Sequence, residues 1–470
     1  MRRARARVAA AVSVALLAAV LGTSDATAAA PLQLGLFDPV YWSEPAVRDP
    51  WLQRTVDAGA DIVRINVAWN AAQRPRKARD PADPAYDFTA VDAQIRDATA
   101  RGLQVLIAFS GAPPWAEGPG RPASARPGTW RPDPAAVGDF AAALALRYSG
   151  RFEDPTAPGT LLPRATAIQP WNEPNFSIYL SPQWEGTRPA APELYRALLN
   201  AAYDGVKSVA PGMLVVTAGT GPFGDPGTGG ERMRPALFWR AVLCVKQTRV
   251  RLRATKTCAA PTRFDVLSHN PYPGGAPGWR SAPDDISIAG MGKLRRIADV
   301  ARRRGRLIPR RKHTPLWVTE VSYDSAPSDP NGVPEALHAR YLQEALYLLW
   351  REGVQAVVWY RILDQAPGVD VGESNQSGLY RLDGTQKPAA QAFRFPFVIE
   401  PGRRGGLVAW GRSPIAGVVT IERRRSGRWK RVRTTRVKRH GTFLVRIAGA
   451  ARPDVLRARV GTERSLGWKR

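Results

Sequence analysis

Short apolar runs alternate with longer amphipathic patterns from Pro31 to about Phe395. Short apolar runs bounded by turn residues are typical of buried strands, whereas apolar residues spaced by three and four are typical of helices. The expected strands are Leu32–Phe37, Ile62–Val67, Gln104–Phe109, Ala165–Trp171, Met213–Ala218, Phe264–Ser268, Leu316–Thr319 and Gln355–Tyr360. The expected helices are Asp49–Ala58, Ala90–Arg101, Pro134–Tyr148, Glu193–Ala210, Pro235–Val242, Ile288–Arg304, Pro334–Arg351 and Lys387–Phe393. Eight strands, each followed by a helix, predict an α/β fold, a (β/α)8 TIM barrel enlarged by insertions. An open doubly wound sheet is the alternative, but eight consecutive units favour closure.

The pattern changes after Phe395. Short alternating runs broken by glycine, proline and serine predict a small C-terminal antiparallel β-sandwich. Its expected strands are Leu407–Trp410, Val418–Glu422, Trp429–Thr434, Phe443–Ile447 and Val455–Val460. We therefore expect a barrel domain over residues 31–396 and a basic accessory domain over residues 397–470.

The first thirty residues have the pattern of an export signal. Arg2, Arg3, Arg5 and Arg7 precede an apolar run from Val8 to Leu21, and Ala26-Thr27-Ala28 offers a cleavage site. The run is shorter than the ~20 residues that a membrane-spanning helix needs. We expect residues 1–30 to be a cleaved signal peptide and the mature protein to be secreted. Elsewhere no window of 18 apolar residues occurs, so no integral membrane span is expected.

Composition narrows the functional classes. The 470 residues, 44% hydrophobic and 23% charged, are typical of a globular protein with one large domain and an accessory. Two cysteines and four histidines exclude a disulfide-built scaffold and make a metal site improbable, so we expect neither metal nor cofactor.

The net charge of +28 is unusual and unevenly distributed. Residues 398–470 carry 20 Lys and Arg against 4 Asp and Glu, and a second basic run lies between Arg302 and Lys312. Inside a cell such charge suggests nucleic acid as a partner, whereas outside a cell it suggests anionic envelope polymers, acidic glycans or membrane surfaces. Codon usage in a GC-rich genome explains the arginine excess equally well.

Two of the predicted strands end in glutamate. One ends in Trp171-Asn172-Glu173-Pro174, and another in Trp317-Val318-Thr319-Glu320. Barrel enzymes carry their chemistry at the carboxyl ends of the strands. Two carboxyl groups over one barrel mouth are what glycoside hydrolysis by double displacement requires.

These strings resemble the catalytic motifs of clan A glycoside hydrolases, in particular families five and thirty-nine. The resemblance covers the barrel and implies catalytic glutamates after strands four and seven. It implies that Glu173 is the general acid/base, that Glu320 is the nucleophile, and that Asn172 binds the 2-hydroxyl of the sugar.

Further contacts follow from strand parity and from the resemblance. In the second strand Arg64 points into the barrel, so we expect it to pair with Glu320. The resemblance implies that His269 and Tyr272 contact the substrate or the nucleophile, and that Trp359 forms an aromatic floor under the cleaved sugar. Trp115 is one of several aromatic residues expected on the top loops, where sugar rings can stack.

Two other signals are less specific. Cys244 and Cys258 bracket a short loop in an exported chain, so a disulfide is favoured over free thiols. The string Gly219-Thr220-Gly221-Pro222-Phe223-Gly224 formally matches a dinucleotide fingerprint, but no helix opens after it and we interpret it as a loop.

The sequence therefore predicts a secreted retaining glycosidase that hydrolyses O-glycosyl bonds of a β-linked oligo- or polysaccharide. A transglycosylase using the same residues, or an inactive barrel that binds carbohydrate or the cell envelope, are the alternatives. An anionic cell-envelope polymer is a further candidate partner for the C-terminal domain.

Overall fold

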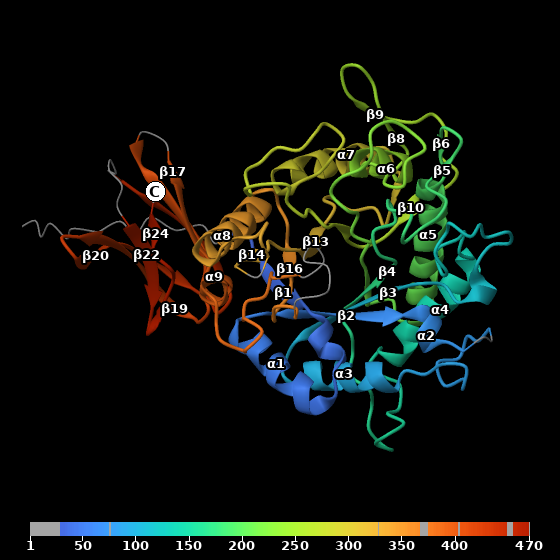
Figure 1. The fold of residues 1–470 in the computed structure, drawn as a ribbon, viewed down its shortest axis with the longest axis horizontal. Coiled ribbons are helices and arrows are strands. Elements are labelled where there is room, and N and C mark those ends of the chain that lie inside the picture. Colours follow the sequence, from blue (N-terminus) through green and yellow to red (C-terminus); the bar gives the residue numbers. More distant parts are fainter. Residues whose placement is uncertain are drawn as a thin grey trace, which may run out of the picture.

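The computed structural model describes residues 29–469 apart from 75–76, 328, 367–374, 403–404 and 449–454. Most of the expected signal peptide, residues 1–28, lies outside the described residues. Figure 1 shows an α/β body on one side and a β-sheet region on the other.

Eight parallel strands form the centre of the body. They are β1 (Gln33–Phe37), β2 (Ile62–Ala68), β3 (Gln104–Ser110), β4 (Ala167–Pro170), β7 (Leu214–Val215), β11 (Leu267–His269), β13 (Leu316–Val321) and β16 (Ala356–Tyr360). Their order is β11-β13-β16-β1-β2-β3-β4-β7, and a parallel bridge between Val216 and Val266 joins the two edge strands. The predicted TIM-like barrel is confirmed.

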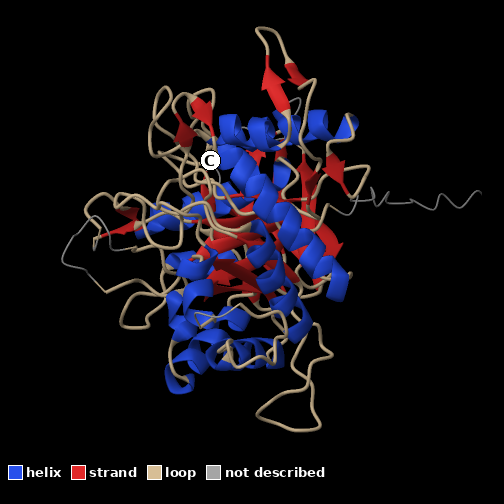
Figure 2. Cartoon of the chain, turned by 90° about the vertical axis from the view of Figure 1, so that its right-hand side faces the viewer, coloured by secondary structure: helices blue, strands red, loops and turns tan. Residues whose placement is uncertain are grey.

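Helices surround these strands, as Figure 2 shows. They are α1 (Pro45–Asp57), α2 (Trp69–Ala72), α3 (Thr89–Ala100), α4 (Pro134–Arg147), α5 (Ala191–Val209), α6 (Pro235–Val242), α7 (Met291–Arg303), α8 (Glu335–Arg351) and α9 (Pro388–Arg394), with three 3-10 turns at Pro39–Trp42, Pro114–Ala116 and Ile288–Gly290. The loops add the short pairs β5 (Trp184–Glu185) with β6 (Arg188–Pro189), β8 (Val245–Gln247) with β9 (Leu252–Ala254), β10 (Thr262–Arg263) with β12 (Leu307–Ile308), and β14 (Ser325–Ala326) with β15 (Val333–Pro334). No helix among the described residues has the length and apolar character that crossing a membrane requires.

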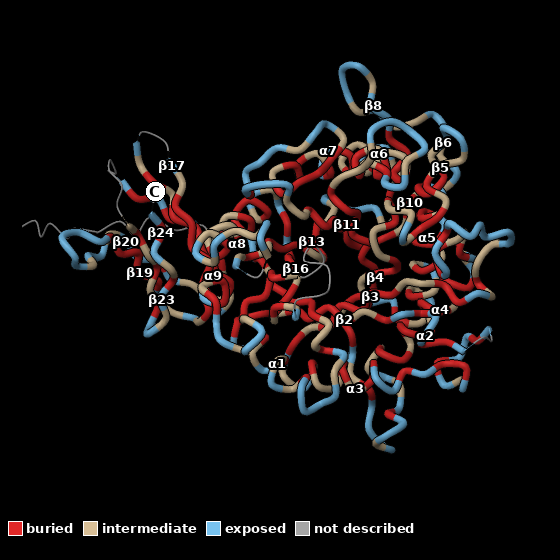
Figure 3. The backbone as a smooth tube through the Cα atoms, in the orientation of Figure 1, coloured by how far each residue is buried: buried red, intermediate tan, exposed pale blue. Residues whose placement is uncertain are grey.

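The barrel has two apolar layers. The larger one packs the outer faces of the strands against the helices. A smaller cluster fills the barrel below the site and comprises Ile62, Leu106, Ala167, Val216, Val266, Trp317 and Ala356. Figure 3 shows the buried strand segments within a rim of exposed loops. Residues that share a strand face with the inner cluster point into the barrel, because side chains alternate along a strand.

The C-terminal region consists of antiparallel sheets, as predicted. One sheet contains β17 (Phe397–Pro401), β18 (Leu407–Arg412) and β21 (Thr442–Ile447). The other contains β19 (Gly417–Arg425), β20 (Arg428–Val437), β22 (Val455–Val460), β23 (Glu463–Arg464) and β24 (Trp468–Lys469).

This region shares its core with the barrel. The fully buried Arg412 donates to the carbonyl oxygens of Leu32 at 3.0 Å and Gly59 at 3.1 Å. The ring of Trp410 lies 5.5 Å from that of Tyr347 on α8. Removing the sheets would leave this barrel face bare, so point variants are the better way to study them.

Candidate active site

An irregular backbone presents Glu173 after β4. Trp171 and Glu173 have positive φ angles of 75° and 33°, a backbone conformation that residues other than glycine rarely adopt. Backbone hydrogen bonds hold the turn, from Trp171 N–H to the oxygen of Phe109 at 2.7 Å and from Glu173 N–H to that of Gly219 at 3.0 Å. Strained backbone of this kind is concentrated at functional sites.

A β-bulge presents Glu320. Val318 pairs with Val357 and Val321 pairs with Trp359, so β13 has one residue more than β16 in this interval. Strict alternation from the inward Trp317 would turn Glu320 toward the helices. The extra residue lets Thr319 and Glu320 both direct polar groups into the barrel, which is how bulges re-aim side chains.

Two hydrogen-bond donors hold the carboxyl group of Glu320. Arg64 Nη1 donates to Oε2 at 2.8 Å, and the Tyr272 hydroxyl donates to Oε1 at 2.6 Å. Arg64 is 1% exposed and also donates to the Asn66 side chain at 2.9 Å and the Asn172 side chain at 3.1 Å. The ion pair expected from strand parity is present, and charge-assisted hydrogen bonds of this kind are among the stronger ones.

Glu173 lies in a different environment. Its carboxyl group accepts one hydrogen bond, from Asn270 Nδ2 at 3.1 Å. Burial, followed by the negative charge of Glu320, raises the pKa of Glu173 to about 8, while Asn270 and Arg64 oppose the rise. Glu173 is therefore protonated at neutral pH beside a carboxylate that carries two donors, a division typical of an acid paired with a nucleophile.

Asn270 is fixed from a second side. Its Oδ1 accepts from the Thr319 hydroxyl at 3.0 Å. A Cβ atom on Gly219 would lie 1.9 Å from that Oδ1, so only glycine fits there. Gly219 is the first glycine of the string that formally matches a dinucleotide fingerprint. Its role here is to let the backbone approach Asn270 closely, so the glycine needs no bound nucleotide to account for it.

The fold is shared with solved glycosidases. A family 39 glycoside hydrolase from the gut symbiont Bacteroides cellulosilyticus WH2 has a TM-score of 0.53 at 19% identity, over 88% of this chain and 81% of that one. A glucosidase from Croceicoccus marinus has a TM-score of 0.52 at 14% identity, over 89% of this chain and 96% of that one. No family model and no curated protein matches the sequence. At these identities the similarity shows the fold, and the sequence resemblance holds at that level.

The network contains some of the expected residues and leaves out others. Arg64 and Tyr272 donate hydrogen bonds to Glu320, and the Asn172 side chain accepts one from Arg64. His269 does not join this network, because it is fully buried and its two ring nitrogens are bonded to the Thr220 hydroxyl and the Ile286 carbonyl, each at 2.8 Å. Burial lowers its pKa to about 4. His269 is therefore a neutral core residue, and its assignment as a substrate contact is corrected.

Trp359 also differs from the expectation. Ala356 belongs to the inner cluster, so Trp359 lies on the opposite face of β16, where its ring is 5.8 Å from that of His338 on α8. Its indole donates to the Ser377 carbonyl at 2.9 Å, and no part of its surface is exposed. Tyr360 is the residue that points inward, and the charge of Glu320 contributes to raising its pKa, after burial. Tyr360 takes the place expected for Trp359.

Trp115 is packed beside the site without contacting either glutamate. It is half-buried and meets the fully buried Trp69 edge to face at 6.0 Å. Its indole nitrogen is buried and has no hydrogen-bond partner among the described residues. The structure gives Trp115 a packing role.

A hollow of about 880 Å³ opens beside the network at the ends of β2 and β3. Its lining includes Asn66, Asn70, Ser110 and Trp42, and the ring of Trp42 is 47% exposed. Asn66 lines the hollow, and its side chain accepts a hydrogen bond from Arg64, which in turn donates to Glu320. The rest of its lining comes largely from α1, α2 and α3.

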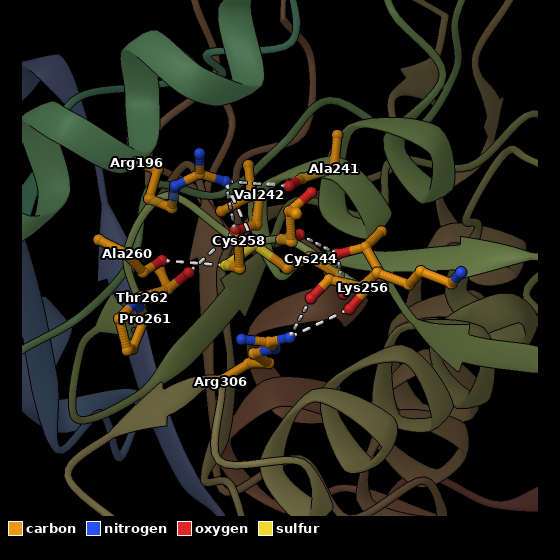
Figure 4. Close-up of a disulfide and its surroundings, with 12 residues drawn as sticks. Arg196, Ala241, Val242, Cys244, Lys256, Cys258, Ala260, Pro261, Thr262 and Arg306 are labelled. Carbon is orange, nitrogen blue, oxygen red and sulfur yellow. Dashed lines mark hydrogen bonds between the residues drawn. A yellow bond between two sulfur atoms is a disulfide. The ribbon is translucent and has the colours of Figure 1, made fainter.

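Cys244 and Cys258 form a disulfide at the base of the β8–β9 hairpin (Figure 4). Within the described ranges, no group of three His, Cys, Asp or Glu side chains is placed to hold a metal ion.

Proposed function

We propose that this protein is a secreted, retaining glycoside hydrolase that cleaves β-glycosidic bonds in an oligo- or polysaccharide. The observation that carries the proposal is the pair of glutamates in one network: Glu173 with a pKa of about 8, and Glu320 bonded to Arg64 and Tyr272. Two solved proteins with a similar fold, a family 39 glycoside hydrolase and a glucosidase, support the same reaction class.

In the first step a carboxylate oxygen of Glu320 bonds to the anomeric carbon while the glycosidic C–O bond breaks. Glu173 transfers its proton to the departing oxygen, so the leaving sugar is released as a neutral alcohol. Arg64 and Tyr272 orient the Glu320 carboxylate, one donor on each oxygen.

In the second step Glu173 changes from acid to base, because the charge of Glu320 has changed. The new ester bond removes the negative charge of Glu320, and with it one cause of the raised pKa of Glu173. Glu173 then accepts a proton from water, the water oxygen bonds to the anomeric carbon, and Glu320 departs as a carboxylate. Two inversions at one carbon give net retention. This mechanism requires the carboxyl groups to be about 5–5.5 Å apart.

The contacts beyond the glutamates agree with a sugar ligand. Asn172 accepts a hydrogen bond from Arg64, and this contact with the network supports its role in binding the hydroxyl next to the anomeric carbon. The hollow at β2 and β3 gives room for a neighbouring ring on Trp42. The basic N-terminal pattern supports export, and exposed arginines on β20 make the sheet region a candidate contact for an anionic envelope polymer.

The test uses two variants and azide, with an aryl β-glycoside as substrate. Glu320→Ala should lose hydrolysis, and azide should restore turnover with an α-glycosyl azide as product. Glu173→Ala should form the ester from substrates with good leaving groups, and azide should then give the β-glycosyl azide. Hydrolysis that both variants retain at the wild-type rate would contradict the assignment.

Two alternatives give different results in the same assays. A transglycosylase would transfer the sugar to an added acceptor in preference to water, with the same dependence on both glutamates. An inactive binding barrel would bind oligosaccharide with no turnover in the wild type.

A further inference from the structure

A basic groove runs along the outside of the barrel, between the β8–β9 hairpin and α7. Two hollows of about 800 Å³ and 530 Å³ share Arg251, Leu252, Val300 and Arg303 and so form one depression, which we call the flank groove. Its remaining lining is Ala236, Arg240, Gln247, Val250, Arg253, Ala254, Thr255, Pro283, Asp284, Lys293, Arg296, Ile297, Asp299, Arg304 and Arg306. From Lys293 to Arg303 it follows α7 for about 15 Å at the rise of a helix.

The hairpin wall of the groove is fixed at its base. The Cys244–Cys258 disulfide joins the chain before β8 to the chain after β9, and Thr255 N–H donates to the Cys244 carbonyl at 2.8 Å. Arg306 then donates to the Thr255 carbonyl at 3.0 Å, tying the hairpin to the segment after α7 (Figure 4). Figure 3 shows the hairpin itself as an exposed projection. A wall held in this way is preorganised for a ligand, because less freedom is lost on binding.

Four arginines that line the groove have no carboxylate partner in the described part of the chain. Arg251 and Arg253 on the hairpin, and Arg303 and Arg304 at the end of α7, are exposed, and no carboxylate among the described residues lies within 4.0 Å of any of them. Two carboxylates also line the groove: Asp284, which is bonded to Arg240 at 2.7 Å, and Asp299 on α7, which is bonded to Arg302 at 3.4 Å.

Some exposed arginines elsewhere on the barrel surface, such as Arg126, Arg151 and Arg280, also lack a carboxylate partner among the described residues, and others have one. Examples are Arg79 with Asp139, Arg188 with Glu193, Arg232 with Asp225, Arg263 with Asp204, and Arg295 with Glu352. What distinguishes the groove is that four unpaired arginines line one depression, two on each wall. The arrangement therefore needs an explanation of its own.

The floor of the groove is aliphatic. Leu252, Ile297 and Val300 line it, and Val250 at the hairpin tip is 88% exposed. No aromatic residue belongs to either lining, so the base stacking on which single-stranded nucleic acids depend has no platform. Sugar rings offer C–H faces to an aliphatic floor, while arginine forks bind carboxylate, sulfate or phosphate groups in pairs of hydrogen bonds.

We propose that the flank groove binds an anionic polysaccharide, away from the glutamates of the barrel mouth. This site is independent of the proposed hydrolysis. It places polymer contact on the barrel flank, whereas the sequence pointed to the C-terminal sheets. A chain held there would keep the protein on a charged glycan while the barrel mouth remains open.

The experiment compares three double variants of the full chain at about 0.15 M salt, where exposed charges are screened beyond ~8 Å. Two variants remove charge from opposite walls: Arg251→Gln with Arg253→Gln, and Arg303→Gln with Arg304→Gln. The matched control, Arg151→Gln with Arg164→Gln, removes the same charge from exposed positions of the barrel outside the groove.

The probes are heparin and polygalacturonate, which carry sulfate and carboxylate, with dextran as the neutral comparison and single-stranded DNA as the other polyanion. Binding is measured by calorimetry, and the thermal midpoint of each variant checks that it is folded. We expect each wall variant to bind at least one of the anionic polysaccharides about tenfold more weakly, or ~1.4 kcal/mol, and the control to match the wild type.

Several outcomes would overturn the proposal. An equal loss in the control would mean that net charge alone attracts the polymer. A loss confined to one wall would mean that the ligand does not lie in the groove. Tighter binding of DNA than of either polysaccharide, or wild-type binding no stronger than that to dextran, would exclude an anionic polysaccharide as the ligand.

Discussion

In the proposed mechanism, raising the pH should abolish hydrolysis through a single group, Glu173. The general acid has to be protonated before the glycosidic bond breaks, and its folded-state pKa lies above the ordinary value of 4.5, at about 8. Activity that depends on this proton is therefore present below pH 8 and is lost as the pH rises through that value.

The magnitude follows from the titration. With a pKa of about 8, about 90% of Glu173 is protonated at pH 7 and about 10% at pH 9, so kcat/KM should fall about tenfold between them. At the ordinary value of 4.5 only about 0.3% would be protonated at pH 7, and the acid would already be lost.

The assay measures kcat/KM against pH for two substrates with the same sugar. That parameter reports the pKa values of the free enzyme, which is the state described here. A methyl or alkyl glycoside needs the acid, so its profile should fall above pH 8. A dinitrophenyl glycoside leaves without a proton, so its profile should stay level there. An alkaline fall that is equal for both substrates, or a profile for the alkyl glycoside that already falls near pH 5, would refute the assignment of Glu173.

Four further variants extend the test. Tyr272→Phe removes a charge-assisted hydrogen bond worth about 2 kcal/mol, so kcat/KM should fall about thirtyfold with little change in the thermal midpoint; an unchanged kcat/KM would exclude a role in orienting the nucleophile. Tyr360→Phe should lower kcat/KM, whereas Trp359→Phe should lower the free energy of unfolding by about 1–3 kcal/mol and spare the kinetics; denaturant curves and kinetics that show the reverse would contradict the strand parity. Replacing Cys244 and Cys258 with serine, which opens a loop with a separation of 14 residues, should cost about 3 kcal/mol of stability by urea unfolding and leave kcat/KM unchanged.

The architecture could be predicted because barrel strands repeat a simple signal. Each is a short apolar run, and each is followed by a helix with its own spacing. Position 64 shows that the same pattern can also predict a side-chain contact. A charged residue between apolar neighbours on a strand has to point into the barrel and needs a group of opposite charge there. For Arg64 that group is Glu320.

Side chains alternate between the two faces of β16, and this alternation selects Tyr360 in place of Trp359 as the residue that points into the barrel. The resemblance to known motifs suggested the tryptophan, and alternation from the small inward Ala356 shows why that was wrong. His269 was misassigned for another reason. Whether a histidine meets the substrate or the core depends on tertiary neighbours, here Thr220 and Ile286, which lie far from it in sequence.

Other features had no signal in the sequence. The bulge that turns Glu320 inward is a matter of register between two strands, which a single strand does not reveal. Asn270 lies between His269 and Tyr272 in the sequence, but its contact with Glu173 depends on Thr319 and on the absence of a side chain at Gly219.

The central claim is that Glu320 forms a covalent bond to the sugar. It is tested most directly by intact mass spectrometry after incubation with a panel of 2-deoxy-2-fluoro β-glycosides that carry a good leaving group. These reagents form the glycosyl-enzyme and then stall, because the fluorine destabilises the second transition state. The account predicts an increase in mass by one fluorosugar, located on Glu320 by peptide mapping and absent in Glu320→Gln. An adduct on a different carboxylate would contradict it.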